Sequence, residues 1–226
     1  LRLKSLAQNI VHLPSGMDLL THINHRRLFI CIFPAFMMAS VIGTISHEYG
    51  HYVIAKAYGY DARINYAKTY WTPKNDEIVS AEKSFYITLG GPLQTMLTGT
   101  IGLVLLYIFR GRFHKKDRLS LIQWILVFLS LFWLRQTANL CVWLSRGLWK
   151  GEFTTSEDEI RMAEYLGLPY WSITALTGLI GAIVLAMVIF KVIPAKQRLT
   201  IVLAGLAGGM TGYILWLILL GKYVMP

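Results

Sequence analysis

Five apolar stretches constrain this sequence more than any other feature. The spans that they predict cover about residues 28–46, 84–109, 119–139, 171–190 and 199–220, and Arg135 is the one charged residue among them. About 20 helical residues cross a hydrocarbon core of about 30 Å. Because hydrophobic residues make up 55% of the chain and charged residues 15%, an ordinary soluble domain is a poor match. The sequence therefore predicts an all-α polytopic membrane protein with about five transmembrane helices.

The distribution of the basic residues predicts an orientation. On the side of the N-terminus, Lys and Arg gather in the first 27 residues and in the loops 110–118 and 191–198, and only Asp18 and Asp117 offset them. Basic loops favour the cytoplasm, so we expect the N-terminus to be cytoplasmic. The net charge of +10 is spread over short loops instead of one soluble face, and we therefore expect contacts with membrane lipid and none with nucleic acid.

Two polar loops interrupt the apolar pattern. Polar and apolar residues alternate from Ala62 to Trp71, and turn-forming residues follow from Thr72 to Asp76, which predicts a small β-hairpin in the first non-cytoplasmic loop. The second loop, Gly147 to Pro169, is acidic and contains a predicted short amphipathic helix. Neither loop separates two domains, so we expect one membrane-embedded domain at residues 28–226, preceded by a cytoplasmic or interfacial segment at residues 1–27.

The sequence His47-Glu48-Tyr49-Gly50-His51 follows the first apolar stretch. On a helix, His47 and His51 project from one face a turn apart, close enough to bind one metal ion. In metalloproteases the Glu of this pattern does not bind zinc but acts as the general base, which is the role expected of Glu48. The histidines could instead hydrogen-bond lipid headgroups or neighbouring helices. We favour the metal site, because ionisable residues at the end of a span are costly unless they are used.

A catalytic zinc ion normally has a third protein ligand and keeps one position for water. The predicted topology requires this ligand to come from the same side of the membrane as the histidines. Asp158, in the acidic loop before the fourth span, is the preferred candidate, and Glu157 and Glu159 are alternatives. The same acidic cluster could also be a solvated loop that caps a helix.

These features resemble the site-2 protease family of intramembrane zinc metalloproteases, and in particular its small, bacterial-type members. The resemblance covers about the first two-thirds of the chain. It rests on the histidine motif beside a membrane helix, on the hairpin-like loop after it, and on Gly90-Gly91-Pro92-Leu93 near the start of the next span. The resemblance implies that His47 and His51 bind Zn²⁺ and that Glu48 is catalytic. It also implies a membrane-protein or peptide substrate.

The sequence departs from the family pattern at two places. The family usually has an Asn after its Gly-Pro segment, whereas Gln94 and Thr95 stand here. The family's Asn-Pro…Leu-Asp-Gly string is absent, and Arg135 and Asn139, followed by Asp158, are a candidate divergent version of it. Gln94, Arg135 and Asn139 are therefore the candidate residues for contacting substrate or stabilising an oxyanion. Arg135 could equally snorkel to the interface, and Asn139 could bond a neighbouring helix.

The function expected from these features is zinc-dependent intramembrane proteolysis of a membrane-protein substrate by zinc-activated water. One alternative is a zinc-binding membrane scaffold that binds partners without hydrolysing them, which the departures from the family pattern favour. Another is a transporter or channel, suggested by the glycine-rich spans and by Arg135 within the membrane. Five spans without a readable repeat argue against a transporter.

Overall fold

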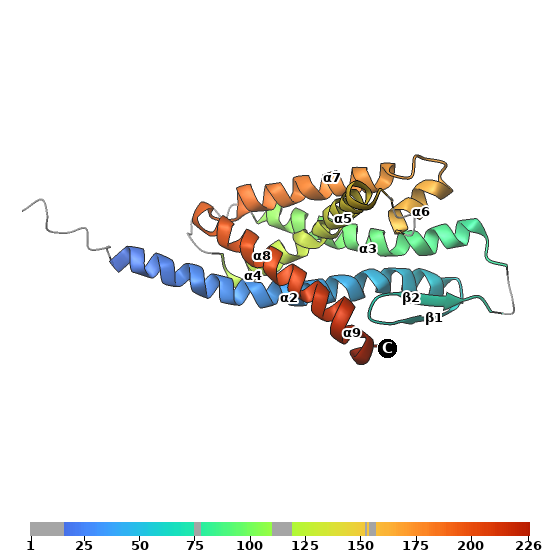
Figure 1. The fold of residues 1–226 in the computed structure, drawn as a ribbon, viewed down its shortest axis with the longest axis horizontal. Coiled ribbons are helices and arrows are strands. Elements are labelled where there is room, and N and C mark those ends of the chain that lie inside the picture. Colours follow the sequence, from blue (N-terminus) through green and yellow to red (C-terminus); the bar gives the residue numbers. More distant parts are fainter. Residues whose placement is uncertain (1–15, 75–77, 110–118, 152, 154–156) are drawn as a thin grey trace, which may run out of the picture.

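The computed structural model describes residues 16–74, 78–109, 119–151, 153 and 157–226. Within these ranges, five helices are long and apolar enough to cross a membrane, in agreement with the number predicted, and they support a multi-pass membrane protein. They are His25–Ala57, Ala81–Ile108, Leu121–Lys150, Ser172–Val192 and Ala195–Val224. The bundle is elongated, and the small hairpin lies at one end of it (Figure 1). Residues 1–15 of the predicted N-terminal segment lie outside the described residues, and its remainder belongs to the first helix.

Several spans are composed of more than one helical segment. The first half of the chain contains α2 (Gly16–Ala57), β1 (Asp61–Ile64), β2 (Thr69–Thr72) and α3 (Ala81–Ile108). The third span consists of α4 (Leu121–Ser130), a 3₁₀ turn (Leu131–Trp133) and α5 (Leu134–Lys150). After α6 (Asp158–Tyr165), the fourth span consists of α7 (Ser172–Met187) and a π-helical turn (Val188–Val192). The last contains a 3₁₀ turn (Ala195–Gln197), α8 (Arg198–Tyr213), a π-helical segment (Ile214–Leu220) and α9 (Gly221–Val224).

The first and third spans extend further than predicted. Helix α2 does not stop near Ser46 but continues through the histidine motif to Ala57. It ends where Gly59, with φ of 78°, follows it, and the amide of Tyr60 donates a hydrogen bond back to the Ala55 carbonyl (3.1 Å). The third span includes Arg135, as predicted, and continues past its predicted end at Asn139 to Lys150. The prediction for the first span stopped too early because it treated polar side chains as boundaries, whereas such side chains stay within a span when they face other protein groups.

Helix α2 packs against both α3 and α8. Its crossing with α3 is a backbone contact, since a Cβ on Gly50 would lie 2.3 Å from the carbonyl oxygen of Gly90, and a Cβ on Gly90 would lie 2.5 Å from that of Gly50. Its crossing with α8 is similarly close at Gly208, where a Cβ would lie 2.3 Å from the Phe33 carbonyl oxygen. Small residues allow this approach in membrane helices. The α2–α3 crossing places the histidine motif beside the start of the second span.

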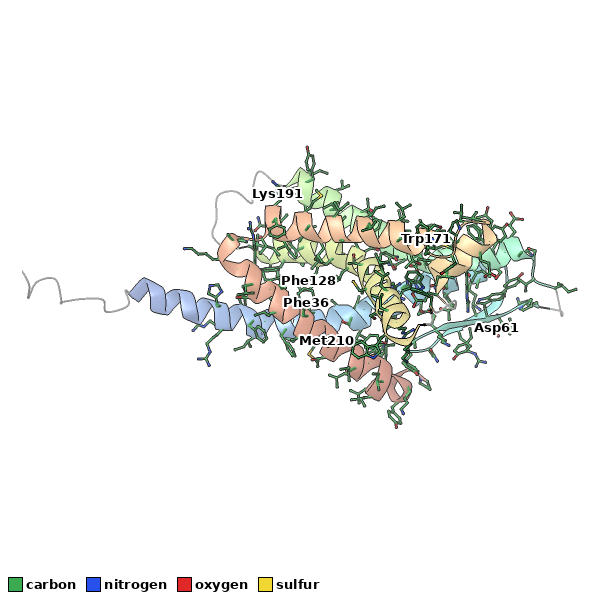
Figure 2. All side chains as sticks on the ribbon, turned by 45° about the horizontal axis from the view of Figure 1, so that its top comes forward. Phe36, Asp61, Phe128, Trp171, Lys191 and Met210 are labelled. Atoms are coloured by element: carbon green, nitrogen blue, oxygen red, sulfur yellow. The ribbon has the colours of Figure 1, made fainter. Side chains whose placement is uncertain are left out.

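The largest apolar cluster lies toward the other end of the bundle from the hairpin. It joins α2 to α4 through Phe36 and Phe128, whose ring centroids are 5.0 Å apart, and both side chains can be followed in Figure 2. The third span also packs on α3, where Gly99 faces the Trp133 ring and the indole nitrogen donates to the Thr100 hydroxyl (3.3 Å). These contacts fix the position of the third span relative to α2 and α3. The geometry of the polar residues at the hairpin end depends on that position.

The hairpin is present, but its turn was wrongly predicted. Strands β1 and β2 pair antiparallel from Asp61↔Thr72 to Ile64↔Thr69, so the turn is at Asn65–Lys68 instead of residues 72–76. The Asn65 side chain forms it, because its Oδ1 accepts hydrogen bonds from the amides of Ala67 (3.0 Å) and Lys68 (2.9 Å). Both strands therefore come from the alternating segment around Ala62 to Trp71, which was predicted to form a single strand.

Candidate metal centre

The two histidines of α2 meet at their Nε2 atoms. These atoms are 3.2 Å apart, and both side chains are buried, with His47 only 1% exposed. The Nδ1 atom of His51 donates to the carbonyl of Ile87 in α3 (2.7 Å). The Nδ1 atom of His47 lies 3.0 Å from the hydroxyl of Thr95, which itself donates to the Gly91 carbonyl (3.1 Å) and can therefore accept from the histidine. Both Nδ1 atoms then carry the proton, and each Nε2 presents a lone pair.

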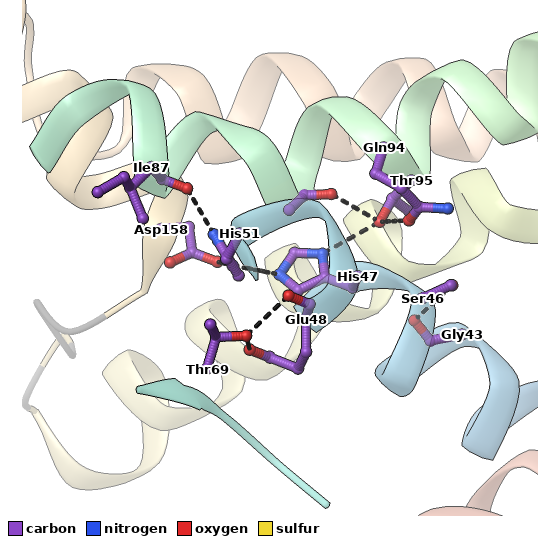
Figure 3. A network of polar contacts seen from close by, with 11 residues as sticks. Gly43, Ser46, His47, Glu48, His51, Thr69, Ile87, Gln94, Thr95 and Asp158 are labelled. Atoms are coloured by element: carbon purple, nitrogen blue, oxygen red, sulfur yellow. Dashed lines mark hydrogen bonds and ion pairs between the residues drawn. The ribbon is translucent and has the colours of Figure 1, made fainter. Parts of the chain in front are cut away.

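Asp158, the first residue of α6, completes this cluster. Its Oδ2 lies 3.0 Å from the Nε2 of His47 and 3.2 Å from the Nε2 of His51, and Figure 3 shows the three side chains turned toward one another. Three atoms with lone pairs thus converge on one point, an arrangement that requires a proton or a metal cation between them.

The sides of this triangle are about 0.1 Å or more below the distances between the ligands of a bound zinc ion. Ligands bound tetrahedrally at about 2.0–2.2 Å lie about 3.3–3.6 Å from one another. The three sides here are 3.0, 3.2 and 3.2 Å. Two imidazole nitrogens and one carboxylate oxygen are a donor set that zinc accepts, and three protein ligands leave a position for water.

Gly91 leaves the centre of the cluster free of protein atoms. A Cβ on Gly91 would lie 2.3 Å from the Nε2 of His51 and 2.7 Å from the Nε2 of His47. A methyl group would thus stand against both nitrogens. Because the α2–α3 crossing brings the backbone of Gly91 this close, a glycine at this position is what leaves room for an ion.

Glu48 lies beside the histidines and is 7% exposed. Its carboxylate oxygen Oε2 lies 3.0 Å from the hydroxyl of Thr69, the first residue of β2 (Figure 3). His47, Glu48 and His51 offer ligand atoms that all lie within 4.8 Å of one another, so this group could hold a metal ion. The Glu48 carboxylate is therefore close enough to the two histidines to be a metal ligand itself.

The remaining predicted residues are placed differently. Gln94 donates from Nε2 to Thr98 one turn along its own helix (3.0 Å), and its Oε1 lies 3.5 Å from the hydroxyl of Thr95, the residue that contacts His47. Arg135 is half-buried in α5, and its charge acts on His47, Glu48 and Glu159. Asn139 is half-buried one turn further along α5.

Glu159, one of the two alternatives to Asp158, is turned into the protein interior. It is 1% exposed, and its Oε1 has no hydrogen-bond partner among the described residues. Burial raises the pKa of the Glu159 carboxyl. Thr69, Ile87 and Gly91 were missed as parts of the centre. The Gly90-Gly91-Pro92 segment was a visible signal for Gly91, whereas Thr69 and the Ile87 carbonyl had none, because both depend on tertiary packing.

Comparisons of the chain with protein-family models, with curated proteins and with solved structures found no match. The function of this chain is therefore inferred from the residues of the centre.

Proposed function

We propose that this chain is an intramembrane zinc metalloprotease of the site-2 type. The observation that carries the proposal is the convergence of His47, His51 and Asp158 on one point at mutual distances of 3.0–3.2 Å. The carboxylate of Glu48 stands beside that point without belonging to the triangle. A donor set of two His and one carboxylate, with a separate carboxylate next to it, suits hydrolysis better than a structural zinc site, which normally has four protein ligands.

In this proposal each residue of the centre has a defined task. His47, His51 and Asp158 hold the zinc ion, and the hydroxyl of Thr95 and the carbonyl of Ile87 orient the two imidazoles. Zinc supplies Lewis-acid chemistry: it polarises the scissile carbonyl and acidifies water. Glu48 accepts the proton of the attacking water and passes it to the leaving amine, which is what a carboxylate at this position can do.

Arg135 is the candidate for balancing negative charge in the reaction. It is the one charged residue within the predicted apolar stretches, and it is half-buried in the third span, which packs on α3. A cation held in a low-dielectric environment stabilises a developing oxyanion more strongly than it would in water. Gln94 is not assigned such a task, because its side chain bonds its own helix.

The hairpin is the candidate binding site for substrate. A peptide bond in a helix is inaccessible to hydrolysis, so a membrane-protein substrate must present an unwound segment. A two-stranded sheet leaves an edge of each strand free to pair with such a segment, and β2 begins at Thr69, beside Glu48. With the N-terminus in the cytoplasm, as the basic loops favour, the centre faces the non-cytoplasmic side.

A zinc-binding scaffold without proteolytic activity is the second candidate function. It is favoured by the engagement of Gln94 with Thr98, since this residue stands near the position where the resembled family has an Asn. The scaffold shares the metal centre with the protease and differs from it in one respect: zinc is bound, but no peptide bond is cleaved.

Metal removal separates these two functions. We expect the purified full-length chain in detergent to cleave a dye-labelled, unfolded casein. Treatment with a zinc chelator should lower the rate to background, and added zinc should restore it, because the general base acts on water only when the metal is present. Release of dye-labelled fragments is the measurement. Bound zinc without any cleavage of casein or of a transmembrane peptide would favour the scaffold.

A further inference from the structure

One side chain of the hairpin contacts the candidate base twice. The Thr69 hydroxyl lies 2.7 Å from the backbone carbonyl oxygen of Glu48 and 3.0 Å from its carboxylate oxygen Oε2. Both contacts reach across from β2 to a residue 21 positions earlier in the chain. The hydroxyl therefore ties the Glu48 side chain back toward the backbone of its own helix (Figure 3).

Thr69 is itself held in place at the base of a supported turn. The Asn65 side chain closes the turn just before it, as described above. The end of the chain also holds this turn at Tyr66. The indole nitrogen of Trp216, in the last span, donates to the Tyr66 carbonyl (2.8 Å), and the Tyr66 amide donates to the carbonyl of Met225, just after that span (2.9 Å). A side chain positioned by such surrounding contacts can hold a functional group more precisely than a mobile loop can.

Glu48 would otherwise be able to bind the metal. Its ligand atom and those of His47 and His51 lie within 4.8 Å of one another, so Glu48 is close enough to the histidines to join them around an ion. Carboxylates are ordinary zinc ligands, and a fourth protein ligand converts an open catalytic site into a closed structural one. A base that becomes a ligand also loses the lone pairs that accept the proton.

We propose that Thr69 is a positioning residue that holds the Glu48 carboxylate out of the metal's ligand set. This inference rests on the proposed function, because it takes His47, His51 and Asp158 as the ligands and Glu48 as the base. The hairpin then has two tasks: it offers a strand edge to substrate, and its first β2 residue keeps the metal site open.

The test uses the full chain in detergent, loaded with Co²⁺ in place of zinc. The visible absorption of Co²⁺ reports the number and geometry of its ligands. Thr69→Val removes the hydroxyl and keeps the shape and strand preference of the side chain, and Thr69→Ser keeps the hydroxyl. Thr211→Val is the matched control, because the Thr211 hydroxyl donates to the Ala207 carbonyl one turn back in α8, a helix that carries no residue of the centre. Casein cleavage by the zinc-loaded variants gives kcat and KM.

We expect Thr69→Val to change the Co²⁺ spectrum and to lower kcat by about 10-fold or more with KM within about two-fold of the wild-type value. Thr69→Ser and Thr211→Val should behave as the wild type does. Adding Glu48→Gln to Thr69→Val should return the spectrum to the wild-type form, since the amide is a poor zinc ligand. This reversal identifies Glu48 as the group that enters the ligand set.

The two proposals fail in different ways. A Thr69→Val protein with the wild-type spectrum and the wild-type kcat overturns the role of Thr69. A wild-type protein that binds Co²⁺ but cleaves neither casein nor a transmembrane peptide, while Thr69→Val still changes the spectrum, overturns the protease and supports the positioning role. A wild-type protein that binds no Co²⁺ overturns both.

Discussion

Replacing Gly91 by alanine should abolish metal binding while leaving the fold intact. The new methyl group would lie 2.3 Å from the Nε2 of His51 and 2.7 Å from the Nε2 of His47, too close for both imidazoles to keep the positions in which they converge. Its close contacts are the ends of side chains and not backbone atoms, so the imidazoles can turn away without separating α2 from α3. Losing a group that only orients a metal ligand lowers metal affinity by about 10- to 100-fold. Because Gly91→Ala displaces two ligands directly, we expect zinc affinity to fall by more than about 100-fold.

The control for this prediction is Gly209→Ala in α8, where an added Cβ meets no atom within 4 Å. Zinc affinity is measured by competition with a chromophoric chelator, and thermal unfolding of the metal-free proteins shows whether the fold is retained. Both variants should unfold at the temperature of the metal-free wild type. If Gly91→Ala binds zinc as tightly as Gly209→Ala does, the ion is not held where these histidines converge.

Replacing Glu48 by glutamine should stop cleavage without removing the metal. The amide has the shape of the carboxylate and can still contact the Thr69 hydroxyl, but it cannot take a proton from water. Loss of a general base costs about 10²- to 10⁴-fold in rate, so we expect kcat to fall by that factor. The zinc content should stay at the wild-type value, because the proposed ligands are unchanged.

Glu82→Gln is the matched control for the loss of one negative charge, since Glu82 is an exposed residue in the first turn of α3. This variant should keep both its zinc and its wild-type rate of casein cleavage. A Glu48→Gln protein that retains zinc and cleaves at the wild-type rate would show that another group is the base. A Glu48→Gln protein that loses zinc would instead place Glu48 among the metal ligands.

The membrane architecture could be predicted from the sequence because lipid selects strongly for uninterrupted apolar helices. The ends of the spans were harder to place. The first and third spans were predicted to end near Ser46 and Asn139, yet α2 and α5 continue to Ala57 and Lys150. In α2 the polar residues His47 and His51 remain within the helix because they face α3 and not lipid. Hydropathy does not reveal which face of a helix a polar residue occupies.

The candidate centre could be predicted in part. Spacing along one helix brought His47 and His51 together, and the requirement for a ligand from the same side of the membrane pointed to Asp158, which lies against both histidines in the structure. The roles of Gly91 and Thr69 could not be predicted. Both depend on how separate elements approach one another, at the α2–α3 crossing in one case and at the turn formed by Asn65 in the other.

The most direct test of the account is the metal content of the detergent-purified full chain, measured by elemental mass spectrometry after zinc is supplied during preparation. The intact protein is compared with His47→Ala and Asp158→Ala, each of which removes one corner of the triangle. The account predicts about one zinc ion per chain in the intact protein and a loss of that zinc in both variants. An intact protein without zinc, or an Asp158→Ala protein that keeps it in full, would contradict the proposed centre.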